Sequence, residues 1–80
     1  MRRLLVVLAI LLSLTLPAAA DKAKSLYNKG RDAEARQNWE QAYEFYKQAY
    51  DLNPKDLRYR TSYLRSRTQS GWVRLRLAQE

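Results

Sequence analysis

Apolar side chains recur at intervals of three and four residues between Asn38 and Pro54, and this pattern constrains the fold more than any other feature of the chain. Residues at such intervals share one face of an α-helix. The stripe consists of Trp39, Ala42, Tyr43, Tyr46, Ala49 and Tyr50. Asn38 is a good N-cap residue, and Gln41 follows it at the spacing of a reciprocal capping interaction. Because the residue before a proline disfavours the α conformation, the sequence predicts a helix over residues 39–52.

A second helical pattern precedes this one. Between Asp21 and Gln37, small or apolar residues follow helical spacing at Ala23, Leu26, Tyr27, Gly30 and Ala33. Only about two residues separate the two predicted helices, so they are expected to pack as an antiparallel pair. Small residues alternate with large aromatic ones, which is typical of a packed core rather than of a cofactor site. The sequence thus predicts an all-α fold.

The spacing of these residues resembles the tetratricopeptide repeat, a 34-residue helical hairpin with the pattern W-x2-L-G-x2-Y, then A-x3-F, an alanine and a proline. On this chain the pattern falls on Leu26, Lys29, Gly30, Ala33, Ala42, Tyr46, Ala49 and Pro54. The residues expected to pack the repeat are Leu26, Gly30, Trp39, Ala42, Tyr46, Ala49 and Pro54. Lys29 and Ala33 depart from the pattern, and we expect the first helix to pack less tightly for that reason.

The resemblance implies a module that binds partner proteins on a concave face, which is lined mainly by the first helices of successive repeats. The corresponding residues here are Lys24, Tyr27 and Arg31, joined by Arg58, Ser62 and Arg65 if a third helix continues the stack. Because guanidinium groups suit carboxylates, the implied ligand is an acidic peptide or a C-terminus. The alternative is that these residues are ordinary solvated charges. One repeat does not bury both of its faces, so self-association, folding on a partner and truncation of a longer protein all stay open.

The first 20 residues have the three parts of a secretory signal peptide. Arg2 and Arg3 form a positive start, residues 4–16 are almost wholly apolar, and Pro17 is expected to break the helix before three alanines. Cleavage is expected after Ala20, with export to the periplasm or cell envelope. The alternative is an uncleaved anchor, although the apolar run is shorter than the roughly 20 residues that span a bilayer. The whole arrangement also resembles the start of longer bacterial envelope proteins, including secretin-type proteins of secretion and pilus systems.

Residues 57–80 are strongly basic, with six arginines and one glutamate. Asp56 can cap a third helix that begins at Leu57, and Gly71 is expected to break or end it. Residues 72–77 alternate with the period of a strand, but such a segment can also fray, extend the helix or lie on a membrane. A change of composition near Thr68 favours truncation of a longer protein. The basic charge makes an anionic membrane surface the alternative partner.

The residue types that are missing exclude most catalytic chemistry. The chain has no cysteine and no histidine, so the usual ligands of zinc, haem and iron–sulfur clusters are absent, as are Ser-His-Asp and Cys-His catalytic groups. The two glycines form no phosphate-binding loop, and Glu40 and Glu44 are expected one turn apart on an exposed helix face. We therefore expect no metal, no cofactor and no enzymatic activity. An exported chain would not meet cytosolic nucleic acid and has no RNA-binding motif, so no nucleic-acid partner is expected.

Overall fold

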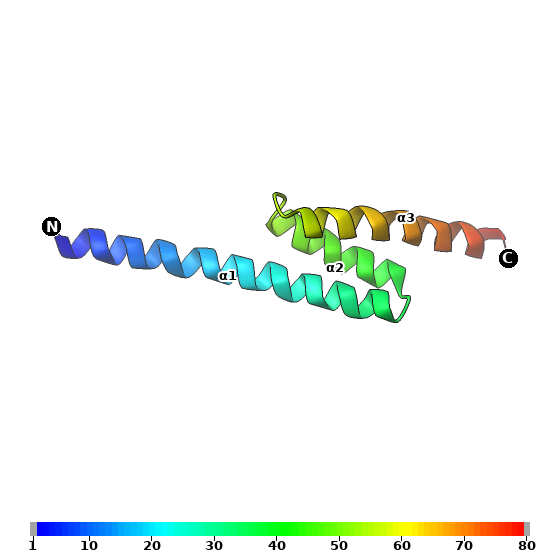
Figure 1. Ribbon diagram of the computed structural model, residues 1–80, viewed down its shortest axis with the longest axis horizontal. Coiled ribbons are helices and arrows are strands. Elements are labelled where there is room, and N and C mark those ends of the chain that lie inside the picture. The colour runs from blue at the N-terminus through cyan, green and yellow to red at the C-terminus, as the bar shows by residue number, and fades with distance from the viewer. Residues whose placement is uncertain (1, 80) are drawn as a thin grey trace.

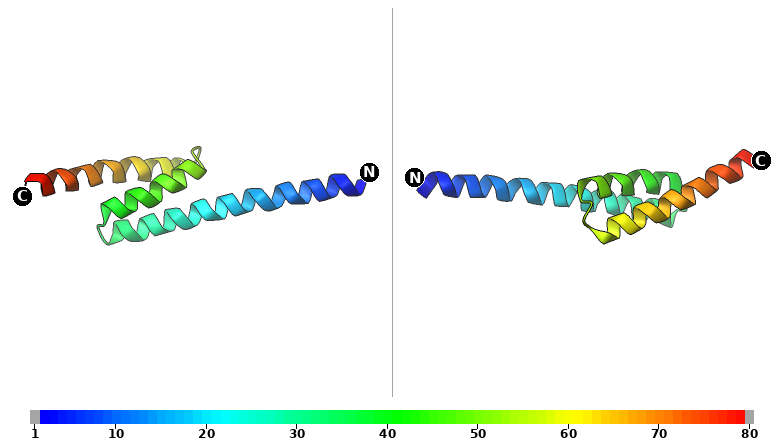
Figure 2. Two further views of the ribbon diagram at one scale, coloured as in Figure 1. Left: turned by 180° about the vertical axis from the view of Figure 1, so that it is seen from behind. Right: turned by 90° about the horizontal axis from the view of Figure 1, so that it is seen from above.

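The computed structural model describes the backbone of residues 2–79 and the side chains of residues 18–79. This part of the chain forms three helices, α1 (Arg2–Ala35), α2 (Trp39–Leu52) and α3 (Leu57–Gln79). Figure 1 shows α2 between α1 and α3 and antiparallel to both, so that the two termini lie at opposite ends. The left view in Figure 2 shows the same order, and both views show the last turns of α3 extending past the hairpin of α1 and α2. The described residues form no strand, which confirms the predicted all-α fold.

The first helix is continuous through Pro17, where the sequence predicts a break. That expectation is wrong. A proline inside a helix removes one backbone hydrogen bond, but leucines and alanines with high helix propensity lie on both sides of this one. Most of the predicted signal sequence falls on residues whose side chains lie outside the described part, so the signal and its cleavage after Ala20 stay predictions. Among the residues that the structure describes, no helix is both long and apolar enough to cross a membrane.

The junction of α1 and α2 reverses the chain through a Schellman motif. Gln37 adopts a left-handed backbone with φ of 58°. The amide N–H groups of Gln37 and Asn38 donate to the carbonyl oxygens of Glu34 and Ala33, each at 2.9 Å. This motif ends α1 at Ala35 and leaves three residues before α2, one more than the sequence predicts. The Asn38 side chain then accepts a hydrogen bond from the Gln41 amide at 3.3 Å, so α2 has the predicted N-cap and the predicted bounds.

Small residues of α1 and α2 pack around buried tyrosines. Ala33 and Ala42 lie against Tyr46, and none of the three is exposed to solvent. Gly30 also lies against this ring, because a Cβ atom at Gly30 would come within 2.6 Å of the Tyr46 ring carbons. Ala33 departs from the repeat pattern, but its complete burial shows that this departure does not open the interface to water.

The other residues expected to pack the hairpin differ in burial. Ala49 is buried with Ala23 and Tyr59, whereas Leu26 and Trp39 are half-buried. Pro54 is exposed. It lies in the loop between α2 and α3, where it ends α2 but has no neighbouring helix to pack against.

The inward face of α3 is made of tyrosines and serines. Tyr63 stacks on Tyr43 and Tyr50 of α2, with ring centroids 5.6 and 5.2 Å apart. Ser66 and Ser70 are buried, and each hydroxyl donates to a carbonyl oxygen one turn back in α3, at 3.0 and 3.2 Å. Short side chains with satisfied hydroxyls let α3 approach α2 closely without leaving a buried polar group unpaired.

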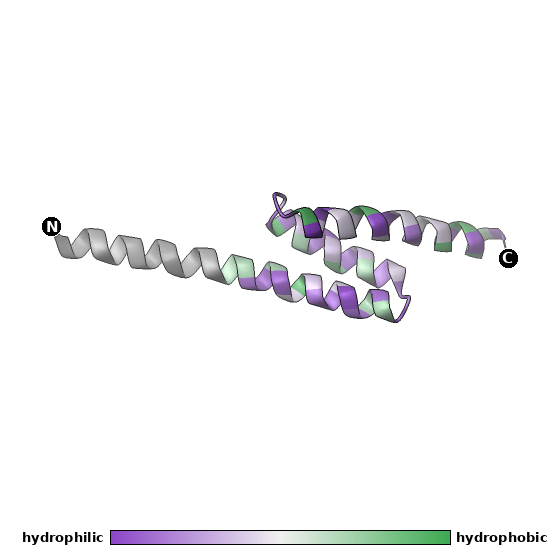
Figure 3. Cartoon of the chain, viewed as in Figure 1, coloured by the Kyte–Doolittle hydropathy of each residue, from purple (hydrophilic) through white to green (hydrophobic). Residues whose placement is uncertain are grey.

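The third helix continues through Gly71 to Gln79, so the expected break at Gly71 is wrong. Residues 72–77 are helical and do not form the strand that their alternating pattern suggests. Of the alternatives that the sequence leaves open, the structure shows extension of the helix. An internal glycine costs a helix only about 1 kcal/mol relative to alanine, and a lone strand would have no partner for its backbone. Figure 3 shows green apolar residues among purple hydrophilic ones along α3 to its far end.

Candidate functional site

Tyr27 is the one aromatic residue of α1 within the described part, and it joins all three helices. Its ring centroid lies 5.6 Å from that of Tyr46 in α2 and 5.1 Å from that of Tyr59 in α3. The guanidinium carbons of Arg31 and Arg58 each lie 5.9 Å from the centroid of the Tyr27 ring. The ring is half-buried, so these cations cover an aromatic surface that remains accessible at one edge.

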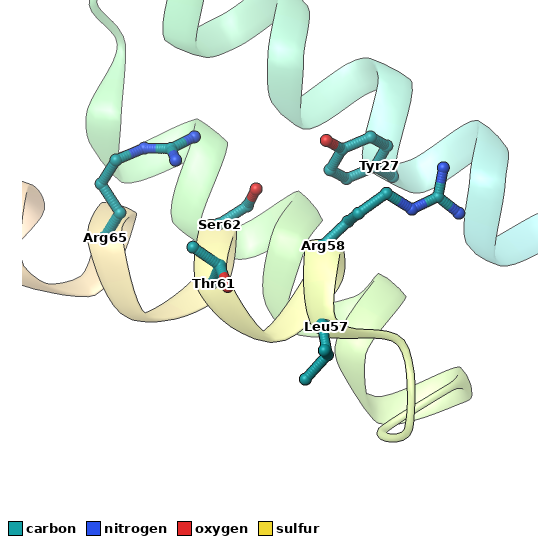
Figure 4. Close-up of a pocket in the computed structure, with 6 residues that line it drawn as sticks. All are labelled: Tyr27, Leu57, Arg58, Thr61, Ser62 and Arg65. Atoms are coloured by element: carbon teal, nitrogen blue, oxygen red, sulfur yellow. The ribbon is translucent and has the colours of Figure 1, made fainter.

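A groove opens beside Tyr27, between α1 and the first half of α3. It has a volume of about 320 Å³ and is lined by Tyr27, Leu57, Arg58, Thr61, Ser62 and Arg65. Five of these residues come from α3. Spacings of three and four residues place them on one side of the helix. Figure 4 shows the guanidinium groups of Arg58 and Arg65 on either side of Ser62, both extended from α3 toward α1. The groove therefore has cations at its two ends and a hydroxyl between them.

Arg58 is held at one end of the groove by the residue that caps α3. Its Nε and Nη2 atoms donate to the two carboxylate oxygens of Asp56, at 3.2 and 2.9 Å. These hydrogen bonds lower the pKa of Asp56 below its ordinary value. Asp56 also accepts from the backbone N–H of Arg58 at 2.9 Å, which is the predicted N-cap of α3. The arrangement fixes the guanidinium while its Nη1 atom makes no hydrogen bond within residues 18–79.

Arg65 is held at the other end of the groove by a carboxylate of α1. Its Nε and Nη2 atoms donate to Oε1 of Glu34, at 3.0 and 2.5 Å. This pair links α1 directly to α3 across the end of α2, and it raises the pKa of Arg65. The Arg65 side chain is still 45% exposed, so part of it can meet a ligand.

The Tyr46 hydroxyl is buried close to this ion pair. It has no hydrogen-bond partner among the described residues. Burial raises the pKa of Tyr46, the negative charge of Glu34 adds to the effect, and Arg65 opposes it. The hydroxyl is therefore neutral at ordinary pH and costs the fold some stability.

The structure brings four of the six residues that the sequence places on a concave face into this groove: Tyr27, Arg58, Ser62 and Arg65. Lys24 and Arg31 are exposed on α1 and do not line the groove, although Arg31 covers the Tyr27 ring. Ser62 is only 4% exposed, which corrects the expectation that it is an exposed lining residue. Its short side chain lies on the side of α3 that faces the hairpin.

Sequence reasoning missed Leu57 and Thr61. Their signal was present, since Leu57, Thr61 and Arg65 are spaced by four residues and so follow one line along α3. A second groove of about 220 Å³, lined by Lys22, Leu26, Gln48, Asp51 and Leu52, lies on α1 and α2. It pairs one cation with one anion and lacks the concentration of positive charge at the first groove.

Comparison of the chain with protein-family models, with curated proteins and with solved structures finds no match. The groove and the charges around it are therefore the features that bear on function.

Proposed function

We propose that the chain is an exported protein-interaction module of the tetratricopeptide type, and that it binds an acidic peptide segment in the groove between α1 and α3. The groove with arginines at both ends is the observation that carries this proposal. The antiparallel α1–α2 hairpin, its small-against-aromatic packing and the parallel course of α1 and α3 also support it. The cell envelope, within a secretion or pilus assembly, is the proposed setting, since the N-terminal residues have the pattern of an export signal.

The chemistry of the groove suits a ligand with two carboxylates. Arg58 and Arg65 are seven residues apart, which is about 10 Å along a helix. A peptide in the polyproline II conformation has three residues per turn and rises about 3.1 Å per residue, so acidic side chains three residues apart share one face at about that distance and would reach both guanidinium groups. The hydroxyl of Thr61 and the exposed edge of Tyr27 would contact the backbone and apolar atoms between them. Because these contacts would join charges that are exposed to solvent, binding should weaken as salt is added.

Titration of a labelled peptide into the full chain tests the proposal. The peptide carries two glutamates three residues apart, and binding is followed by fluorescence anisotropy. The double variant Arg58→Gln and Arg65→Gln should lose at least about tenfold in affinity, because hydrogen bonds to charged groups contribute about 1.5–3 kcal/mol.

The matched control is the double variant Arg60→Gln and Arg67→Gln. It removes the same charge from the same helix but outside the groove, so it should bind nearly as well as the unaltered chain. Equal losses in both variants would mean that the groove is not the site. Circular dichroism shows whether loss of the Arg65–Glu34 pair has unfolded the groove variant.

Export has its own test. Expression of the full chain in a bacterium should give a periplasmic product with the mass of residues 21–80. Ala20→Tyr should prevent cleavage after residue 20. A cytoplasmic product that retains Arg2 would contradict the proposed setting without touching the proposed peptide site.

A further inference from the structure

The outward face of α3 carries an apolar stripe that no other helix covers. Leu57, Leu64 and Leu75 follow one another at intervals of about two and three helical turns, so they lie along one line of the helix. They are 71%, 44% and 50% exposed. Trp72, which is 61% exposed, lies one turn from Leu75 on the edge of the same face. The α2 helix packs against the opposite side of α3, through Tyr59 and the buried serines.

Arginines flank this stripe on both sides. Arg60, Arg67 and Arg74 are spaced by seven residues and form one row, and Arg58, Arg65 and Arg76 lie on the other flank. Three of the six are paired with carboxylates of the chain, at Asp56, Glu34 and Glu40. Arg60, Arg67 and Arg76 make no ion pair within residues 18–79, so they keep their full charge beside the exposed leucines.

We infer that this face of α3 lies on an anionic lipid surface, with the helix axis parallel to it. Leucine and tryptophan side chains between rows of arginine match a layer in which acyl chains lie beneath charged phosphates. The arginine stems can lie along the apolar stripe while their guanidinium groups reach the phosphates. Leu57, Arg58 and Arg65 also line the groove, but the lipid surface is a different ligand from the peptide, and the inference does not depend on that proposed function.

Charge decides between a lipid surface and a second copy of the chain. Two copies that met through this face would bring arginine rows against arginine rows, with one glutamate in residues 57–80 to offset them. An anionic membrane offers many negative groups to the same rows, and each basic residue held near it adds to the attraction. An acidic protein partner is the remaining occupant, and the experiment separates it from lipid.

Trp72 provides a local probe of this contact. The chain has two tryptophans, so Trp39→Phe leaves Trp72 alone in the otherwise full-length protein. The probe is added to vesicles of neutral phosphatidylcholine, or of phosphatidylcholine with phosphatidylglycerol, in which some acyl chains are brominated. With the anionic vesicles we expect a blue shift of Trp72 emission and quenching by bromine, and with the neutral ones neither. The readout reports α3 itself, whether or not residues 1–20 also hold the chain on the vesicle.

Two variants in the same background decide the inference. The triple variant Arg60→Gln, Arg67→Gln and Arg76→Gln should lower Trp72 quenching to its level in neutral vesicles. The triple variant Lys22→Gln, Lys29→Gln and Lys47→Gln removes the same charge from exposed positions of α1 and α2 and should retain the quenching. Trp72 emission that stays unshifted in anionic vesicles, or quenching that survives loss of the three arginines, would overturn the inference. A shift produced by a poly-glutamate peptide and not by vesicles would assign the face to an acidic protein.

Discussion

At the scale of single residues, α1 and α2 pack closely together at Gly30. A Cβ atom there would come within 2.6 Å of two Tyr46 ring carbons, and the ring is fully buried, so it has no room to move away. Gly30→Ala should therefore lower the free energy of unfolding by about 1–2 kcal/mol, because overpacking outweighs the better helix propensity of alanine. Gly71→Ala is the matched control, since nothing lies within 4 Å of its Cβ position. It should raise stability by about 0.5–1 kcal/mol. Urea unfolding followed by circular dichroism would measure both, and changes of the same sign would contradict the packing described.

The Tyr46 hydroxyl gives a second prediction at this scale. It is buried and unpaired among the described residues, so Tyr46→Phe should raise stability by about 1 kcal/mol. Burial raises the pKa of Tyr46, which means that the fold favours the protonated form. Protonation of Tyr46 therefore leaves the stability of the fold unchanged below the unfolded pKa of about 10, and stability is lost as the pH rises through the higher folded pKa. The unfolding temperature of the Tyr46→Phe variant should therefore fall less steeply above pH 10 than that of the unaltered chain. Tyr50→Phe serves as the control, and an equal change in slope there would remove the assignment to Tyr46.

At the scale of the helix, the start of α3 depends on Asp56. Its carboxylate accepts the Arg58 amide and holds the Arg58 guanidinium, and these bonds lower its pKa. The resulting stability is present above the unfolded pKa of about 4 and is lost as the pH falls through the lower folded pKa. Asp56→Ala should cost about 1 kcal/mol at pH 7 and less at pH 2, where only the charge-independent part of the cap is left, whereas Asp56→Asn, also a good N-cap, should cost less than Asp56→Ala at pH 7. Thermal unfolding at both pH values would measure this. An equal loss from Asp56→Ala at pH 2 and at pH 7 would show that the charge of the Asp56 carboxylate does not stabilise the start of α3.

The helices also differ in how far the sequence predicts them, and the reason is physical. The bounds of α2 follow from local signals, since Asn38 and Pro54 act on their immediate neighbours. The end of α1 has a weaker local signal, because glutamine and not glycine takes the left-handed position at Gln37. The length of α3 differs from the sequence prediction because the helix propensity of the surrounding residues outweighs the cost of Gly71.

The groove was predicted only in part for a different reason. Helical spacing places Arg58 and Arg65 on one side of α3, but it does not show that Ser62 turns inward or that Glu34 of α1 reaches Arg65. Those features depend on the packing of three helices together. They therefore become visible only when the relative positions of α1, α2 and α3 are known.

At the scale of the whole molecule, Tyr27 connects the two core clusters. It packs against the cluster of Ala23, Ala49 and Tyr59 and also against that of Ala33, Ala42 and Tyr46. A domain of this size has little stability to spare. Tyr27→Ala should therefore cost about 2–3 kcal/mol and speed amide hydrogen exchange in α1, α2 and α3 together.

Tyr43→Ala is the comparison, because Tyr43 stacks only on Tyr63, across the α2–α3 interface. It should speed exchange mainly in α3 and leave the α1–α2 hairpin protected. The two patterns differ because a residue shared by both clusters affects every helix, whereas a residue at one interface loosens only the helix that it holds. If Tyr27→Ala sped exchange in α1 alone, the three helices would not form one cooperative unit. The groove between α1 and α3 would then have no fixed width. Tyr27→Phe keeps the aromatic ring, so this variant should retain both the exchange pattern and the peptide binding of the unaltered chain.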